Sequence, residues 1–134
     1  MKYLDTNVLL AASLGRGSQG EKAKTLLRSF STKGEVMTSA LAIDEFVWTL
    51  TGITRKRNEA VEQAILLFHL SGLTITPVTR PASYHSLLYM KKYPHLRPRD
   101  ALHIATALAS GADCIVSNDK DFDGIKEIKR EALA

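Results

Sequence analysis

The stretch KYLDTN, residues 2–7, holds the pattern that decides the fold. Its first half is a short, mostly apolar run, and the three residues that follow, Asp5, Thr6 and Asn7, are types that cap helices or make turns. This order predicts a strand, a turn and then a helix from about Asn7 to Ser13. Two glycines at positions 15 and 17 would end that helix.

Three further strands are predicted along the chain. EVMT (35–38) precedes the capping residue type Ser39, LTIT (73–76) precedes Pro77, and CIVS (114–117) follows a helical pattern. Helices are expected over residues 19–31, from 39 to an interruption at Gly52, and over 56–70, 82–92 and 100–109. Because helical crossovers return the chain for parallel pairing, we expect an α/β fold with a short, mainly parallel central sheet covered by helices on both faces.

The size and composition of the chain set simple bounds. With 134 residues, 45% of them hydrophobic, residues 1–134 are expected to form a single domain with one packed core. The one cysteine, Cys114, excludes a disulfide framework. The apolar runs are too short to cross a bilayer, and the first residues lack the apolar segment of a signal peptide. We therefore expect a cytoplasmic protein with no membrane association.

Two acids come at or just beyond the ends of predicted strands. Asp5 follows the first strand and Asp119 follows the last. Ligands bind beyond the carboxyl ends of the strands in open parallel sheets, so these two carboxylates are expected to share a site. Asp100 begins the helix that leads to the last strand, and a simple return path would place that helix start at the opposite edge of the sheet. Topology alone therefore does not place Asp100 in the site.

Glu45 lies within the apolar helical stretch LAIDEFVW, residues 41–48. A carboxylate near the core needs a partner, and a bound cation would supply one. Taken singly, Glu45 and the other acids also have ordinary explanations as caps, turn residues or exposed helix charges. Only as a set do they indicate a functional site.

Four motifs together resemble those of PIN-domain ribonucleases. They are YLDTN (3–7), Glu45 in its apolar helix, RDALHIATA (99–107) and SNDKDF (117–122). Their order and spacing match across almost the whole chain, and the set also resembles the VapC toxins of type II toxin–antitoxin systems. The resemblance implies a PIN-like α/β/α sandwich in which the start of the Asp100 helix approaches the site. It implies catalytic roles for Asp5, Glu45, Asp100 and Asp119.

The resemblance also implies a metal site for Mg²⁺, with Mn²⁺ as the alternative, because both ions prefer carboxylate and water oxygens. Glu45 would act either as a ligand or as a base that orients a water molecule. Either Asp119 or Asp121 could complete the set, and one ion or two could bind. The expected metal ligands are Asp5, Glu45, Asp100, Asp119 and Asp121.

Several other polar residues accompany these acids in the sequence. Asn7 and Ser117 resemble the polar helpers of the family, which hydrogen-bond a ligand carboxylate and fix its orientation. His103 has apolar neighbours one turn away, as packed histidines commonly do, so it is left outside the predicted site. Arg97 and Arg99 flank the site and are candidates to contact RNA phosphates, or else belong to the solvated surface.

The function implied by the resemblance is hydrolysis of RNA phosphodiester bonds by metal-activated water, in a homodimer that a cognate antitoxin protein blocks. Setting the four acids aside leaves ten acidic against eighteen basic side chains, which favours an anionic polymer as substrate. The alternative is a catalytically silent PIN-like module that binds RNA or protein. A haloacid-dehalogenase-like phosphatase needs a second aspartate where Asn7 stands, and a receiver domain needs paired acids that the chain lacks. Which RNA is cut is not readable from the sequence.

Overall fold

The computed structural model describes residues 1–133, and the side chains of all of these except residues 30 and 31. Strands and helices alternate along most of the chain, as predicted. Within the described residues, no helix combines the length and the apolar character needed to span a membrane. The elements are β1 (Lys2–Leu4), α1 (Thr6–Leu14), α2 (Gly17–Lys33), β2 (Val36–Ser39), α3 (Ala40–Thr54), α4 (Arg57–Phe68), β3 (Leu73–Thr76), α5 (Arg80–Lys92), α6 (Pro98–Ala109), β4 (Cys114–Val116), the 3-10 helix η1 (Lys120–Phe122) and β5 (Lys129–Glu131).

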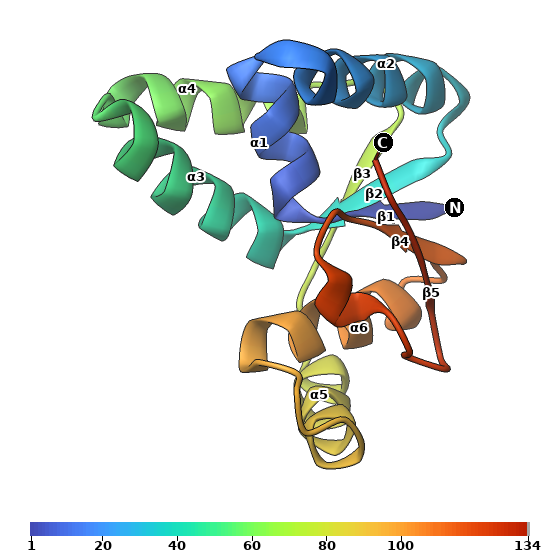
Figure 1. Cartoon of the computed structure of the whole chain (residues 1–134). Helices are drawn as coiled ribbons and strands as arrows, with labels where there is room; N and C mark the ends of the chain where they lie inside the picture. The colour runs from blue at the N-terminus through green and yellow to red at the C-terminus, as the bar shows by residue number, and fades with distance from the viewer. Residues whose placement is uncertain (134) are drawn as a thin grey trace.

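The strands form one sheet in the order β3-β2-β1-β4-β5, and every pair is parallel (Figure 1). β1 is central, because Tyr3 pairs with Met37 of β2 on one side and with Ile115 of β4 on the other. The prediction of a mainly parallel sheet is therefore confirmed. β5 was not predicted, because a three-residue edge strand with the sequence KRE has no apolar signal.

Helices cover both faces of this sheet. α1 to α4 lie on one side, and α5 and α6 lie on the other (Figure 1). Adjacent residues of a strand point to opposite faces, and β1 divides its side chains in this way. Tyr3 packs in a buried cluster with Ile104 of α6, whereas Leu4 packs in a second cluster with Phe46 of α3. The two clusters form the sandwich that was predicted, and Tyr3 faces the helix that carries Asp100.

Helix α3 begins as predicted and ends later than predicted. Ser39 caps it, and the Ser39 hydroxyl oxygen accepts a hydrogen bond from the Ala42 amide at 3.2 Å. The predicted interruption at Gly52 is wrong, because the helix continues past it to Thr54, and Arg55 caps its end with a φ of 62°. A glycine costs a helix about 1 kcal/mol. Burial of apolar side chains such as Phe46 on the same helix offsets that cost.

Helices α5 and α6 both lie between β3 and β4 in the chain, and the second of them carries Asp100. In a parallel sheet, the helix before a strand runs antiparallel to that strand, so it starts near the carboxyl edge of the sheet. Asp100 lies in the first turn of α6 and close to Asp119, which follows β4. The expectation that a return path would place this helix start at the opposite edge is therefore wrong.

Candidate metal centre

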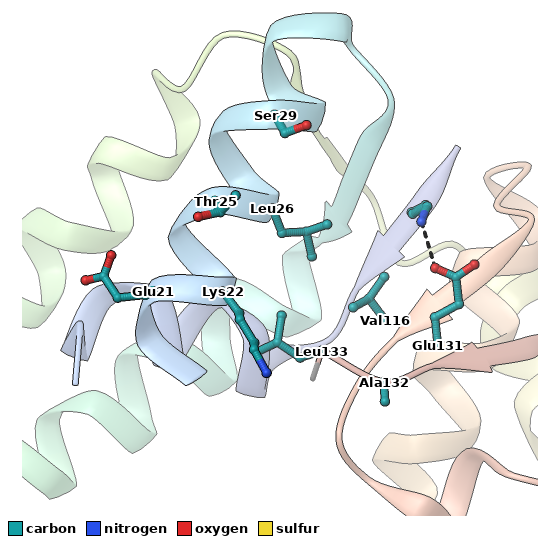
Figure 2. A pocket seen from close by; sticks show the side chains of 10 residues that line it. Glu21, Lys22, Thr25, Leu26, Ser29, Val116, Glu131, Ala132 and Leu133 are labelled. Atoms are coloured by element: carbon teal, nitrogen blue, oxygen red, sulfur yellow. Dashed lines mark hydrogen bonds and ion pairs between the residues drawn. The ribbon is translucent and has the colours of Figure 1, made fainter. Parts of the chain in front are cut away.

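A hollow of about 440 Å³ lies between α2 and the strands β1, β4 and β5 (Figure 2). Leu26 and Leu133 line it together with an ion pair between Lys2 and Glu131, whose Nζ and Oε2 atoms lie 2.7 Å apart. None of the predicted site acids lines this hollow. Those acids lie instead at the carboxyl edge of the sheet.

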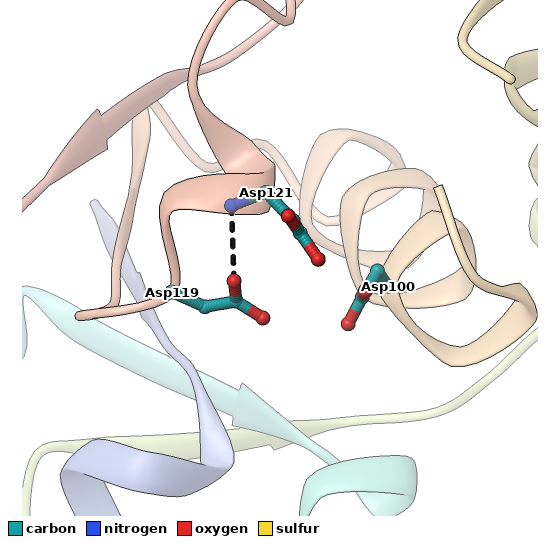
Figure 3. Close-up of side chains that lie close together, drawn as sticks. All are labelled: Asp100, Asp119 and Asp121. Atoms are coloured by element: carbon teal, nitrogen blue, oxygen red, sulfur yellow. Dashed lines mark hydrogen bonds between the residues drawn. The ribbon is translucent and has the colours of Figure 1, made fainter. Parts of the chain in front are cut away.

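Three acids at that edge lie close together. Asp100 comes from the first turn of α6, Asp119 from the loop after β4, and Asp121 from η1 (Figure 3). One carboxylate oxygen from each lies within 4.8 Å of the other two. The sequence left the choice between Asp119 and Asp121 open, and the structure brings both of them to Asp100.

The proximity of these carboxylates makes ionisation of Asp100 costly. Burial, followed by the negative charges of Asp119 and Asp5, raises the pKa of Asp100 to about 6. Carboxylates that share a site repel one another, and a positive charge between them removes that penalty. The cluster is therefore electrostatically suited to bind a cation.

The turn after β4 explains how residues two apart in the sequence reach the same site. Asp119 caps η1, and its Oδ1 atom accepts a hydrogen bond from the amide of Asp121 at 2.9 Å. Phe122, which is 1% exposed, anchors η1 in the buried cluster that faces α6. One oxygen of Asp119 is thus used inside the turn, and the other is directed toward the gap before Asp100 (Figure 3).

Asp5 is buried, with 7% of its surface exposed. Both of its oxygens accept hydrogen bonds: Oδ1 from the Thr6 amide at 2.8 Å and Oδ2 from the Ser117 hydroxyl at 2.7 Å. Burial raises the pKa of Asp5, although His103, Ser117 and Thr6 favour its ionised form. Because the charge of Asp5 also raises the pKa of Asp100, the two carboxylates belong to one electrostatic site.

Ser117 connects the loops that carry Asp5 and Asp119. Its buried hydroxyl donates to Asp5, and it accepts hydrogen bonds from the Asn7 side-chain amide at 3.1 Å and from the Asp119 backbone amide at 3.0 Å. The Oδ1 atom of Asn7 is buried and has no hydrogen-bond partner in the described part of the chain. A buried acceptor of this kind would be satisfied by a water molecule of a hydrated cation.

Glu45 has hydrogen-bond partners within the protein, although the sequence predicted a bound cation as its partner. Its Oε1 atom accepts hydrogen bonds from His103 Nε2 and from the Thr6 hydroxyl, the latter at 3.0 Å. Burial opposes the ionisation of Glu45, but the hydrogen bonds from His103 and Thr6 outweigh it and hold the pKa of Glu45 below its usual value. Glu45 is therefore kept as a carboxylate by the protein itself.

His103 lies in the candidate site, although sequence reasoning left it out. It is 2% exposed, its Nε2 atom contacts Glu45 and lies 3.7 Å from Asp5 Oδ1, and its Nδ1 atom lies 2.6 Å from the Tyr3 hydroxyl. The signal that could have found it is its position three residues after Asp100. Residues three apart share a face of a helix, so both side chains are directed toward the same edge of the sheet.

As a donor set, this edge of the sheet fits a hard divalent cation. Mg²⁺ and ions like it prefer carboxylate oxygens and retain several water molecules. Such an ion would relieve the repulsion that raises the pKa of Asp100, and its hydration water would satisfy the unpartnered Oδ1 atom of Asn7. The metal that fits is therefore of the class that was expected.

Comparison with known proteins places the chain in a family. The model of the PIN domain matches residues 2–128. Two mycobacterial relatives, the VapC ribonuclease Mb1869c of Mycobacterium bovis and ribonuclease VapC13 of Mycobacterium tuberculosis, are each 32% identical to the chain over 111 residues, which cover 82% of this chain and 83% of the relative.

Solved structures have the same fold at lower sequence identity. VapBC2 of Rickettsia felis, bound to a DNA fragment from its promoter, aligns with a TM-score of 0.77 and 16% identity over 98% of both chains. VapC20 of Mycobacterium tuberculosis, described as a toxin that cleaves the sarcin-ricin loop, aligns with a TM-score of 0.75 and 21% identity over 96% of this chain and 98% of that one. Because the PIN-domain model matches residues 2–128 and two relatives are 32% identical over most of their length, this chain belongs to the PIN-domain family.

Proposed function

We propose that the protein is an endoribonuclease that depends on Mg²⁺ or Mn²⁺ and acts as the toxin of a toxin–antitoxin pair. The observation that carries the proposal is the cluster of Asp100, Asp119 and Asp121, whose mutual repulsion a divalent cation would relieve. The names of its relatives support the substrate class, because both proteins at 32% identity are called ribonucleases.

The proposed metal ligands are the carboxylates of Asp5, Asp100 and Asp119, with Asp121 as a further ligand. When bound, the ion would lower the pKa of a water molecule and polarise a phosphate oxygen. Ser117 keeps the Asp5 carboxylate in one orientation, and the cap of η1 does the same for Asp119. Preorganised ligands of this kind need little rearrangement when substrate arrives.

Glu45 is proposed as the group that orients the attacking water molecule and accepts its proton. Its low pKa leaves it ionised at neutral pH, as a proton acceptor must be, and it lies beside Asp5 through their shared contact with His103. Arg99 is exposed, and its positive charge lowers the pKa of Glu45. Arg99 is therefore the arginine best placed to bind an RNA phosphate, and Arg97 is a second candidate.

The protein partners are proposed from exposed apolar side chains together with the known complexes of the fold. Trp48 and Ile53 on α3 are 78% and 51% exposed, and Tyr84 and Leu87 on α5 are 61% and 58% exposed. Large exposed apolar side chains that gather on a surface indicate binding to other proteins. We propose that they serve homodimerisation and the binding of a cognate antitoxin, and that residues 1–134 act as one cytoplasmic domain.

The test is cleavage of RNA by the purified protein. A circular RNA should be opened in the presence of Mg²⁺ or Mn²⁺, since only an endonuclease can cut a substrate without ends. EDTA and Asp5→Asn should each abolish cleavage, whereas Asp44→Asn, which changes an exposed acid next to Glu45, should not. Cleavage that persists in EDTA or in Asp5→Asn would refute the metal mechanism, and RNA binding without cleavage would favour the silent module.

A further inference from the structure

A continuous chain of hydrogen bonds runs through the buried interior toward Glu45. It joins Ser39 at the end of β2, Tyr3 on β1, His103 on α6 and Glu45 on α3. The Tyr3 hydroxyl lies 2.6 Å from both Ser39 Oγ and His103 Nδ1. Ser39, Tyr3 and His103 are each no more than 2% exposed, so the chain is shielded from solvent until it reaches the half-buried Glu45.

The direction of these hydrogen bonds follows from counting protons. Ser39 Oγ already accepts from the Ala42 amide, and among the described contacts the Tyr3 hydroxyl is the acceptor available to its own proton. Tyr3 then donates to His103 Nδ1, and His103 donates from Nε2 to the Glu45 carboxylate, which can only accept. In the reverse direction Ser39 would accept twice, and its proton would have no acceptor among the described contacts.

Tyr3 is chemically suited to its place in this chain. Burial raises its pKa, so its hydroxyl keeps the proton that it donates. Its ring meets the His103 ring edge to face, with centroids 5.7 Å apart and planes at 66°, which restricts rotation of the imidazole. The histidine is thus held both by the hydrogen bond at Nδ1 and by packing of its ring.

We propose that His103 is a positioning residue for the reaction and that Tyr3 and Ser39 fix its orientation. In this inference, which rests on the proposed function, His103 donates from Nε2 and fixes one oxygen of Glu45. The Thr6 hydroxyl donates to the same oxygen, Oε1. The Glu45 carboxylate is therefore held by donors from α1 and α6, and its second oxygen is left for the attacking water molecule.

The first test uses the metal-free protein and no RNA. Two-bond nitrogen–proton correlations in ¹⁵N-labelled protein should show that the imidazole of His103 carries its proton on Nε2, with Nδ1 unprotonated as the acceptor of the Tyr3 hydroxyl. The His103 signals are assigned by their loss in His103→Gln. A proton on Nδ1, alone or together with one on Nε2, would reverse the bond to Tyr3 and overturn the proposed chain.

The second test removes one hydroxyl. Tyr3→Phe should shift the His103 Nδ1 resonance and the carboxyl carbon of Glu45. Tyr93→Phe is the matched control, because it removes a tyrosine hydroxyl that donates to Glu127 at 2.6 Å, outside this chain of hydrogen bonds. It should leave both signals in place. Unchanged signals in Tyr3→Phe would refute a role for Tyr3 in orienting the histidine.

The third test separates positioning from folding by kinetics. His103→Gln should lower the kcat of RNA cleavage by about 10- to 100-fold, the usual cost of losing a residue that orients an active-site group, with little change in KM. Tyr3→Phe should lower kcat less, and Tyr93→Phe should not change it. An equal loss in Tyr93→Phe, or a loss confined to KM in His103→Gln, would refute positioning. If the wild-type protein cleaves no RNA, the proposed function fails, and the two spectroscopic tests still decide the hydrogen-bond chain.

Discussion

The acidic site has two halves, Glu45 on one side and the cluster of Asp100, Asp119 and Asp121 on the other, and their carboxylates have opposite electrostatic surroundings. Glu45 is surrounded by hydrogen-bond donors from the protein and has a lowered pKa, whereas Asp100 faces other carboxylates and has a pKa raised to about 6. Asp5 lies between them and accepts bonds at both oxygens, from Thr6 and Ser117. The difference teaches where a cation is needed, because protein donors stabilise the charge of Glu45, whereas the repulsion among Asp100, Asp119 and Asp121 has no ion-pair partner to relieve it within the described contacts.

The largest expected effect concerns the affinity for Mn²⁺, measured by calorimetry or by electron paramagnetic resonance. Asp100→Asn should weaken binding by on the order of a hundredfold, since it removes one of the three clustered carboxylates. Glu45→Gln should weaken it by less than about tenfold, because Glu45 already has protein partners. Asp44→Asn serves as the control. A greater loss in Glu45→Gln than in Asp100→Asn would break the distinction between the two halves and make Glu45 a main ligand.

A smaller effect, on the free energy of unfolding, is expected at Ser117, which connects the loops that carry Asp5 and Asp119. Ser117→Ala would remove three hydrogen bonds from a fully buried position, to Asp5, Asn7 and Asp119. Leaving buried polar groups unpaired should lower the free energy of unfolding by about 1–3 kcal/mol. Urea unfolding measures it, with Ser13→Ala as a control that removes an exposed hydrogen bond. A loss no larger than that of the control would show that the two loops do not depend on Ser117.

The smallest effect is a pair of opposite changes in thermal stability of the metal-free protein. The folded-state pKa of Asp100 is raised, so its ionisation costs stability above pH 6, and that cost disappears as the pH falls toward 4. Asp100→Asn should therefore raise Tm at pH 7.5 by on the order of 3 °C, a value that allows for solvent screening of a half-exposed group. The gain should vanish near pH 4.

Glu45→Gln should change Tm in the opposite direction to Asp100→Asn. The folded-state pKa of Glu45 is lowered, so its ionisation contributes stability above its usual pKa of 4.5, and that contribution is lost as the pH falls through the folded-state value. The variant should therefore lower Tm at pH 7.5 and have little effect at pH 4 or below. Changes of the same sign in both variants would contradict the assignment of opposite electrostatic environments.

Local patterns in the sequence were sufficient to predict most of the fold. The apolar strands were identified because central parallel strands are buried on both faces, and Ser39 was identified as a cap from its residue type. The predicted break at Gly52 was wrong because packing elsewhere on α3 outweighs a local propensity. β5 was missed because an edge strand of charged residues is defined by its pairing with β4 and not by its own sequence.

The candidate site was less accessible from the sequence. Strand order placed Asp5 and Asp119 at one edge, and β1 and β4 are indeed adjacent and parallel. Placing Asp100 in the site requires the direction of α6, and the sequence-based expectation for that direction was wrong. The contact between His103 and Glu45 joins residues 58 positions apart, and no local pattern predicts which side chain will fill a gap between two helices. Roles as metal ligands remain predictions until an ion is measured in the site.

The pairing of β1 with β4 has a consequence for protein synthesis. Residues 2–4 pair with residues 114–116, and the acids of the site are distributed from position 5 to position 121. Such long-range contacts form late, since loop closure must precede them. A nascent chain of a hundred residues would carry Asp5 and Glu45 but not the strand and turn that bring Asp119 to them. The acidic site, and any cleavage that depends on it, can therefore form during translation only after residue 121 has been synthesised.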